Sequence, residues 1–175
     1  MQALDAVKAG LIVFFAAVLQ VTILSSVDIS GGTPDLLLVT LVAVALLRGP
    51  IFGAAAGFVG GLLVDTATLE TLGLTSLVLT VAGYWIGRYG ETTGRDRAHA
   101  PLLSIVVVTV LYAAAAYGLH FMLGDDVSAR LVLVDSLPPA VLFNLLLAPP
   151  VYALCRRALR PAEPGDRTRE VRLLG

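Results

Sequence analysis

Apolar residues occur in long continuous blocks along this chain, separated by short stretches of charge, proline and glycine. An α-helix needs about 20 residues, at about 1.5 Å each, to cross the hydrocarbon core of a membrane. Cutting the chain at the polar stretches gives six apolar segments, at about residues 9–27, 35–47, 50–64, 72–87, 101–123 and 131–154. We therefore predict an all-α membrane protein with six transmembrane helices, of which the second and third are short.

Two other kinds of structure fit this pattern poorly. The first apolar segment is longer than the core of a secretory signal peptide, and further apolar segments follow it. Transmembrane strands would alternate apolar and polar residues, whereas these segments are apolar throughout. Because a lipid-buried backbone must satisfy its own hydrogen bonds, the pattern predicts helices.

Residues 35–64 allow two arrangements, because segments of about 13 and 15 residues cover only about 20 to 23 Å. They form either two short spans or one re-entrant hairpin with Arg48, Gly49 and Pro50 at its tip. A buried arginine at a hairpin tip would need a partner, so we expect two spans.

The composition supports a membrane protein and excludes several functions. Of the 175 residues, 57% are hydrophobic and 14% are charged, whereas soluble domains carry about 25% charged residues. The formal net charge of -1 provides no basic field, so we expect no nucleic-acid partner. A single cysteine, Cys155, excludes an internal disulfide and any multi-cysteine metal site.

Basic residues are sorted to one side of the predicted membrane. With the amino terminus in the cytoplasm, 11 of the 12 Lys and Arg residues lie inside and only Arg130 lies outside. Aromatic residues such as Trp85 and Tyr89 mark the cytoplasmic end of the fourth segment. We predict one integral membrane domain over residues 1–155 with both termini cytoplasmic, and a short basic cytoplasmic tail over residues 156–175. Its arginines suit either anionic lipid headgroups or a protein contact, and electrostatics favours the lipid.

Glycines form a regular row in the third and fourth segments. Gly49, Gly53, Gly57 and Gly61 recur every four residues, and Gly83 and Gly87 repeat the spacing. Such a row lies on one helix face and lets another helix approach closely, which is how helices gain van der Waals contact in lipid. It predicts either packing among the six helices or a docking face for the helix of a partner. Pairing of two copies through the same glycines is left open.

Polar residues in the apolar segments are further candidates, because they are costly in lipid. Asp35 directly follows a proline, as a residue at the start of a helix often does. Asp65 ends the third segment, where its own helix dipole repels it, so solvent or Arg130 would have to compensate. Gln20 and Asn144 favour hydrogen bonds between helices over binding of a ligand.

No arrangement of residues points to catalysis. The serines lie outside any nucleophile-elbow pattern, and no glycine-rich loop ends in the lysine that a phosphate-binding site needs. His120 has no second histidine or cysteine nearby in the sequence, which disfavours a metal site. We therefore predict a protein that is not an enzyme and that holds neither a cofactor nor a metal.

Taken together, several of these residues resemble the bacterial rod shape-determining protein family MreD. The resemblance is carried by Gln20, Pro34-Asp35-Leu36-Leu37-Leu38, Arg48-Gly49-Pro50, Gly53, Gly57-Phe58, Gly61-Leu62-Leu63, Asp65, Gly73-Leu74 and Gly83-Tyr84. It covers about residues 10–90. The later segments match by length and hydropathy, and Pro149-Pro150 near the end of the last segment is consistent with it.

The resemblance implies a non-enzymatic scaffold in the bacterial inner (plasma) membrane that helps maintain rod shape. It implies that the chain binds the transmembrane helix of MreC and, through it, helps couple MreB filaments to peptidoglycan synthesis by RodA and a class B penicillin-binding protein. The six-helix outline is also similar to S components of energy-coupling-factor vitamin transporters, and a vitamin-binding subunit is the alternative function. Such a subunit needs converging polar groups, whereas the outer halves here are mostly Leu, Val and Ala, so we expect the scaffold.

Overall fold

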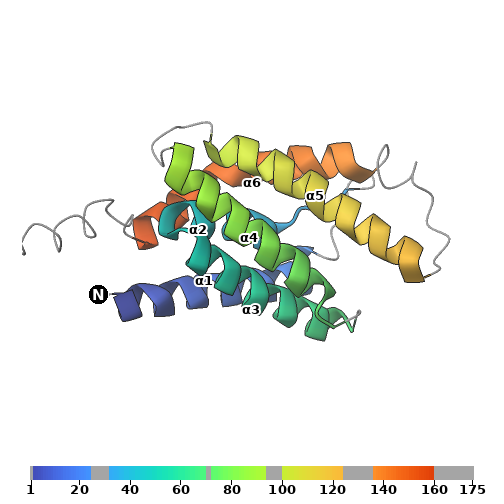
Figure 1. Ribbon diagram of the computed structural model, residues 1–175, viewed down its shortest axis with the longest axis horizontal. Coiled ribbons are helices and arrows are strands. Elements are labelled where there is room, and N and C mark those ends of the chain that lie inside the picture. The colour runs from blue at the N-terminus through green and yellow to red at the C-terminus, as the bar shows by residue number, and fades with distance from the viewer. Residues whose placement is uncertain (1, 25–31, 70–71, 94–99, 124–135, 160–175) are drawn as a thin grey trace, which may run out of the picture.

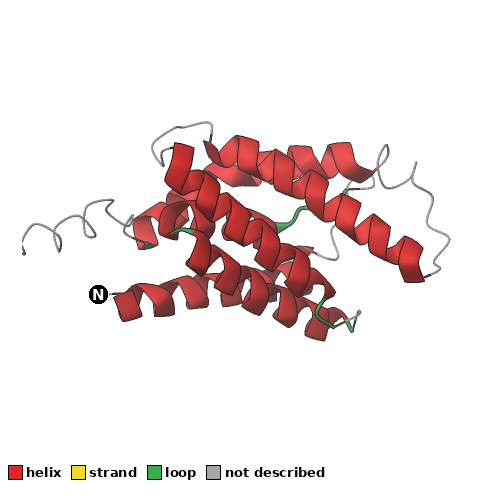
Figure 2. Cartoon of the chain, in the orientation of Figure 1, coloured by secondary structure: helices red, strands yellow, loops and turns green. Residues whose placement is uncertain are grey.

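The computed structural model describes residues 2–24, 32–69, 72–93, 100–123 and 136–159. These ranges hold six α-helices and no β-strand, as Figure 2 shows. The helices are α1 (Gln2–Thr22), α2 (Leu36–Arg48), α3 (Pro50–Thr68), α4 (Leu74–Thr93), α5 (Ala100–Leu123) and α6 (Leu137–Ala158). The predicted all-α architecture with six helices is therefore confirmed.

Helix α2 lies in the middle of the bundle. In Figure 1, α1 and α3 run along one side, α5 and α6 along the other, and α2 and α4 lie between them. All residues from Leu37 to Leu47 are buried, because α2 contacts each of the other five helices. A helix that is apolar on every face suits a position surrounded by other helices. At 13 residues it is short, as expected.

The prediction that the third helix is short was wrong. α3 has 19 residues and continues to Thr68 instead of ending near Val64. The hydroxyls of Thr66 and Thr68 donate to carbonyls four residues earlier, at 2.6 and 2.9 Å, so these polar side chains are satisfied within the helix. The change to polar residues therefore does not mark the end of this helix.

Within the described ranges, four helices are long and apolar enough to cross a membrane. They are Asp5–Thr22 within α1, the whole of α3, Ala100–Gly118 within α5, and α6. α2 is an apolar helix of 13 residues, and the last turns of α4 carry Arg88 and Glu91. Crossing by all six helices therefore stays a prediction.

Four of the helix boundaries that differ from those expected concern α1, α4 and α6. α1 begins at Gln2 instead of about residue 9, and α4 extends to Thr93 instead of about residue 87. α6 begins at Leu137, with prolines in its first turn, where the missing amide proton costs nothing. α6 also continues to Ala158, so Pro149 and Pro150 lie inside the helix and not near its end.

The described chain ends lie at the same end of the bundle, as Figure 1 shows. Leu159, which follows α6, is fully buried in the same cluster as Ala9 of α1. Arg48, the last residue of α2, pairs with Asp5 of α1. α2 thus returns along α1 to the end where the chain starts.

The described basic residues gather at this end too. Gly87 of α4 packs on Pro50 at the start of α3, which places the carboxyl-terminal part of α4 beside Arg48. The residues concerned are Lys8, Arg48, Arg88, Arg156 and Arg157. The charge sorting deduced from the sequence thus corresponds to one end of the folded molecule. We call it the basic end.

Candidate functional site

The row of glycines on α3 packs directly against the backbone of α4. A methyl group added to Gly53 would clash with the carbonyl of Gly83, and one added to Gly57 would clash with the carbonyl of Leu79. The two helices are therefore in backbone contact, which only glycine permits at these positions.

The same contact continues toward both ends of the helices. A methyl group at Gly61 would clash with the backbone of Ser76, and the Ser76 hydroxyl donates to the Phe58 carbonyl at 2.9 Å. At the basic end, Gly87 meets the backbone of Gly49 and Pro50. We call this surface the glycine interface: Gly53, Gly57 and Gly61 of α3 with Gly83 and Gly87 of α4, closed by Gly49.

The glycine interface is filled from within the chain. Of the two uses expected for the row, the structure shows packing among the chain's own helices, with α4 seated along it. A partner's helix could not lie in the same place, so any such helix must use another face.

Asp35 caps the start of α2, as its place after Pro34 suggests. Its carboxylate accepts a hydrogen bond from the Leu38 amide at 2.9 Å. Gln20 of α1 adds two bonds beside it, accepting from the Leu36 amide at 2.8 Å and donating to the Pro34 carbonyl at 3.2 Å. One amide side chain thereby holds the end of α1 against the start of α2.

Asn144 ties the α5–α6 pair to the same point. Its side-chain oxygen accepts from the Asp35 amide at 2.8 Å, and its nitrogen donates to the Thr109 hydroxyl at 3.1 Å. Asn144 is 1% exposed, so these bonds form away from solvent. We call Gln20, Asp35, Thr109 and Asn144 the polar cluster. It joins α1, α2, α5 and α6, and its members are bonded to the protein itself.

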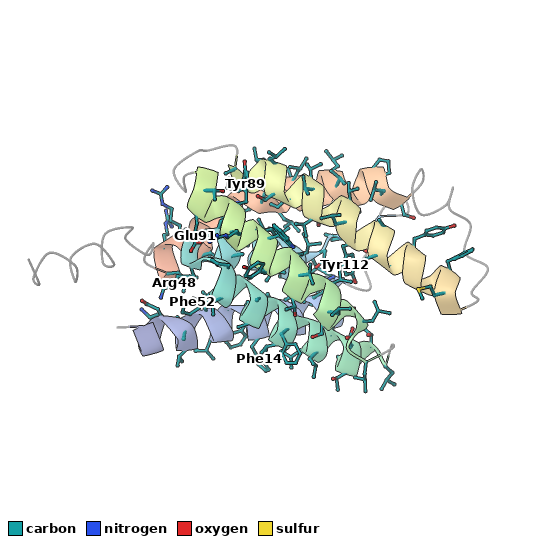
Figure 3. All side chains as sticks on the ribbon, in the orientation of Figure 1. Phe14, Arg48, Phe52, Tyr89, Glu91 and Tyr112 are labelled. Carbon is teal, nitrogen blue, oxygen red and sulfur yellow. The ribbon has the colours of Figure 1, made fainter. Side chains whose placement is uncertain are left out.

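Arg48 lies at the basic end, held by two neighbours. Its guanidinium is 3.1 Å from the Asp5 carboxylate and lies over the Phe52 ring, 5.1 Å from the centroid. Figure 3 shows Arg48 and Phe52 side by side. Because both charged side chains are largely shielded from solvent, at 7% and 18% exposed, the pair is screened less than a surface pair would be.

Asp65 is buried against the start of α4, which corrects the expectation that solvent would compensate its charge. The residue is fully buried, and its carboxylate accepts from the amides of Gly73 and Ser76, at 2.8 and 3.4 Å. These amides belong to the start of α4, where the helix dipole favours a negative charge. Arg130 lies outside the described residues. From the sequence alone only the dipole of α3 was apparent, because nothing in it shows that the start of α4 lies beside Asp65.

An open apolar groove runs between α4 and α5 and holds about 490 Å³. Leu77, Val81 and Trp85 form the rim on α4, and each is at least half exposed. Ser104 lies in the wall on α5 and is 6% exposed. The full lining is Leu77, Val78, Val81, Ala82, Trp85, Ile86 and Tyr89 of α4, and Leu103, Ser104, Val107, Val108, Leu111 and Ala115 of α5.

This groove is not apparent from the sequence. The lining residues recur every three or four positions, but any helix face that meets lipid shows that pattern. The distinguishing feature is a difference between two faces of α4: glycines on the face toward α3, and Leu, Val and Trp on the face toward α5. Such a difference identifies a groove only when the neighbour of each face is known.

Few groups in the groove could bind a polar ligand. Its walls are apolar apart from one serine hydroxyl and the polar edges of Trp85 and Tyr89. Within the part of the chain that the structure describes, no three His, Cys, Asp or Glu side chains come together as metal ligands would. The groove is suited to contact with apolar surfaces, such as another helix or lipid.

Comparison with known proteins gives one match. A family model for the rod shape-determining protein MreD matches residues 3–158. Neither the curated proteins nor the solved structures include a significant match, so the similarity to S components stays a prediction. The match extends the resemblance seen in residues 10–90 to nearly the whole chain, including α5 and α6. The chain therefore belongs to the MreD family of rod shape-determining proteins.

Proposed function

We propose that the protein is a non-enzymatic scaffold of the cell-elongation machinery, and that the groove between α4 and α5 receives the transmembrane helix of MreC. Through MreC it helps couple MreB filaments to wall synthesis by RodA and a class B penicillin-binding protein. The groove carries this proposal, because it is an open apolar surface in a bundle whose glycine interface is already occupied.

The dimensions of the groove suit a helix. Its wall on α4 runs from Leu77 to Tyr89, which is about 18 Å of helix. That length covers more than half of a hydrocarbon core about 30 Å thick. Helices in lipid associate through van der Waals packing, so a concave apolar surface offers a second helix more contact than a convex one.

The two ends of the groove differ in a way that would orient the partner. Trp85 and Tyr89 lie toward the basic end, and Arg88 follows Trp85 by one turn of α4. Aromatic and basic residues collect at the cytoplasmic surface of membranes. We propose that this end faces the cytoplasm, with both chain termini on that side of the bacterial inner membrane and residues 156–175 near anionic headgroups.

The alternative, a vitamin-binding S component, has less support. The groove is apolar, and the polar side chains that could serve a vitamin, Gln20, Asp35 and Asn144, are bonded to one another's helices. Pairing of two copies would have to use a face other than the glycine interface, because α4 covers that interface.

Filling the groove tests the proposal. Val81→Trp adds a large side chain on the groove wall, at a residue that is 51% exposed. Capture of MreC by the purified protein should fall at least tenfold because the incoming helix loses its place. The matched control is Val59→Trp on α3, a valine that is 50% exposed outside the groove and should capture MreC normally. Equal capture by all three proteins would refute the groove, as would equal losses from both substitutions.

A further inference from the structure

The hydroxyl of Ser104 is an unpaired polar group in the wall of the apolar groove. The residue belongs to α5, lines the groove and is 6% exposed. The hydroxyls of Thr66 and Thr80 donate to carbonyls of their own helices, but that of Ser104 makes no hydrogen bond within the part of the chain that the structure describes. Its oxygen keeps accessible surface, unlike the unpaired and enclosed Oδ1 of Asp65. The hydroxyl is therefore open toward the groove.

Ser104 lies at the basic end of the groove. It is about one turn inside the start of α5, and Tyr89 is about one turn before the end of α4. Both residues line the groove, and Figure 1 shows these two helix ends next to each other. Toward the other end of the groove, the lining consists of apolar residues such as Leu77, Leu111 and Ala115. The groove therefore offers polar atoms at one end only.

Docking of a helix would change the surroundings of the Ser104 hydroxyl. While the groove is open, water at the basic end can bond to it. A helix seated in the groove excludes that water, and an apolar side chain opposite Ser104 would leave the hydroxyl without a partner, which costs free energy. A hydroxyl or amide side chain in the same place avoids this cost, because such groups bridge membrane helices by hydrogen bonds.

We infer that the transmembrane helix of MreC carries a hydroxyl or amide side chain about one turn inside its cytoplasmic end, and that this side chain forms a hydrogen bond with Ser104. The inference rests on the proposed docking of MreC in the groove. The bond sets the depth of the helix in the membrane, because the apolar walls favour no particular depth. Ser104 is thus a residue that determines which helices the groove accepts.

Ser104→Ala tests the inference, because it removes the hydroxyl and keeps the side chain small. The affinity of the purified protein for MreC in bicelles, measured by energy transfer, should fall about threefold, which is the average effect of one hydrogen bond between membrane helices. The free energy of unfolding should not fall, because the hydroxyl has no hydrogen-bond partner within the described chain. Unchanged affinity for MreC would overturn the inference.

Ser76→Ala is the matched control. Ser76 is also a buried serine, at 1% exposed, but it lies outside the groove and its hydroxyl donates to the Phe58 carbonyl at 2.9 Å. This variant should lose stability and bind MreC with unchanged affinity, which is the opposite of the result expected for Ser104→Ala. If Ser104→Ala instead lost stability and kept its affinity, the Ser104 hydroxyl would have a structural role alone and the inference would be wrong.

Substitutions in MreC identify the side chain that bonds to Ser104. Each Ser, Thr, Asn or Gln in the cytoplasmic third of its transmembrane helix is changed to Ala in turn. One change should weaken binding to the unmodified protein about threefold and leave binding to Ser104→Ala unaffected. The absence of such a coupled residue would overturn the inference. Val81→Trp separates the two proposals: if it abolishes capture of MreC while Ser104→Ala has no effect, the hydrogen bond alone is refuted, whereas capture by Val81→Trp refutes the groove.

Discussion

Helix α4 is packed closely on one face and open on the other. Toward α3 it presents Gly83 and Gly87, and the two backbones touch. Toward α5 it presents Leu77, Val81 and Trp85, and a groove of about 490 Å³ remains. Gly83 and Val81 are only two positions apart, yet one belongs to the closed face and the other to the open one.

The difference shows how a membrane helix divides its surface between internal and external contacts. Burial of apolar area drives association weakly in lipid, so the distance between backbones decides how much van der Waals contact forms. Glycine lets α3 and α4 come together, and that contact needs no partner. Larger side chains hold α5 away from α4 and leave a surface that another apolar body can fill.

The largest loss of stability should come from a substitution at the close contact between α3 and α4. Gly57→Ala puts a methyl group against the backbone of Leu79, which cannot move aside as a flexible side chain could. We expect a loss of at least about 2 kcal/mol in the free energy of unfolding, measured by steric trapping in bicelles.

The control for this variant is Gly10→Ala, where the added methyl group meets no atom within 4 Å. That variant should be as stable as the unmodified protein. If Gly57→Ala were as stable as Gly10→Ala, the closeness of α3 and α4 would have no energetic role.

A smaller loss of stability should follow from removing the hydrogen bonds that hold α5 and α6 to the start of α2. Asn144→Ala removes both bonds that link α6 to Asp35 and Thr109, and it leaves a buried amide and a buried hydroxyl without these partners. We expect a loss of about 1 to 3 kcal/mol by the same measurement. Leu142→Ala, at a site of α6 that is 65% exposed, should change stability little. Similar losses from both variants would mean that the polar cluster does not hold α5 and α6 in place.

The smallest expected energy is that of the ion pair between Asp5 and Arg48 at the basic end. A double-mutant cycle with Asp5→Asn and Arg48→Met should give a coupling of about 1 kcal/mol, because the two side chains are largely shielded from solvent. The control cycle uses Arg88 and Glu91, which are 3.4 Å apart but 59% and 39% exposed, and whose coupling should be undetectable. Equal couplings in the two cycles would show that shielding at the basic end has no effect.

Several residues of the site were predictable because their signals are local. Asp35 after Pro34 indicated a helix start, and the structure shows the cap. Gln20 and Asn144 indicated hydrogen bonds between helices, and both form them. What remained hidden was that their bonds meet at one place, the start of α2, because the partners are up to 109 positions apart in the chain.

Two errors arose because a polar residue was judged without the group that satisfies it. Asp65 was judged by the dipole of α3, but the amides of α4 hold its carboxylate. The length of α3 was judged by where polarity begins, but the helix continues to Thr68, and its threonine hydroxyls are satisfied by carbonyls of the same helix. In both cases the sequence indicated the residue and not the neighbour that satisfies it.

By itself, the sequence determined the helical membrane architecture, the sorting of basic residues and the glycine spacing. These follow from hydropathy, charge and the helical period, which act within one segment at a time. Only the tertiary structure decided that the glycine row is occupied by α4 and that the open surface lies between α4 and α5. The reason is that a helix face is closed or open according to the side chains of both helices, and the sequence of one helix does not specify which helix lies opposite.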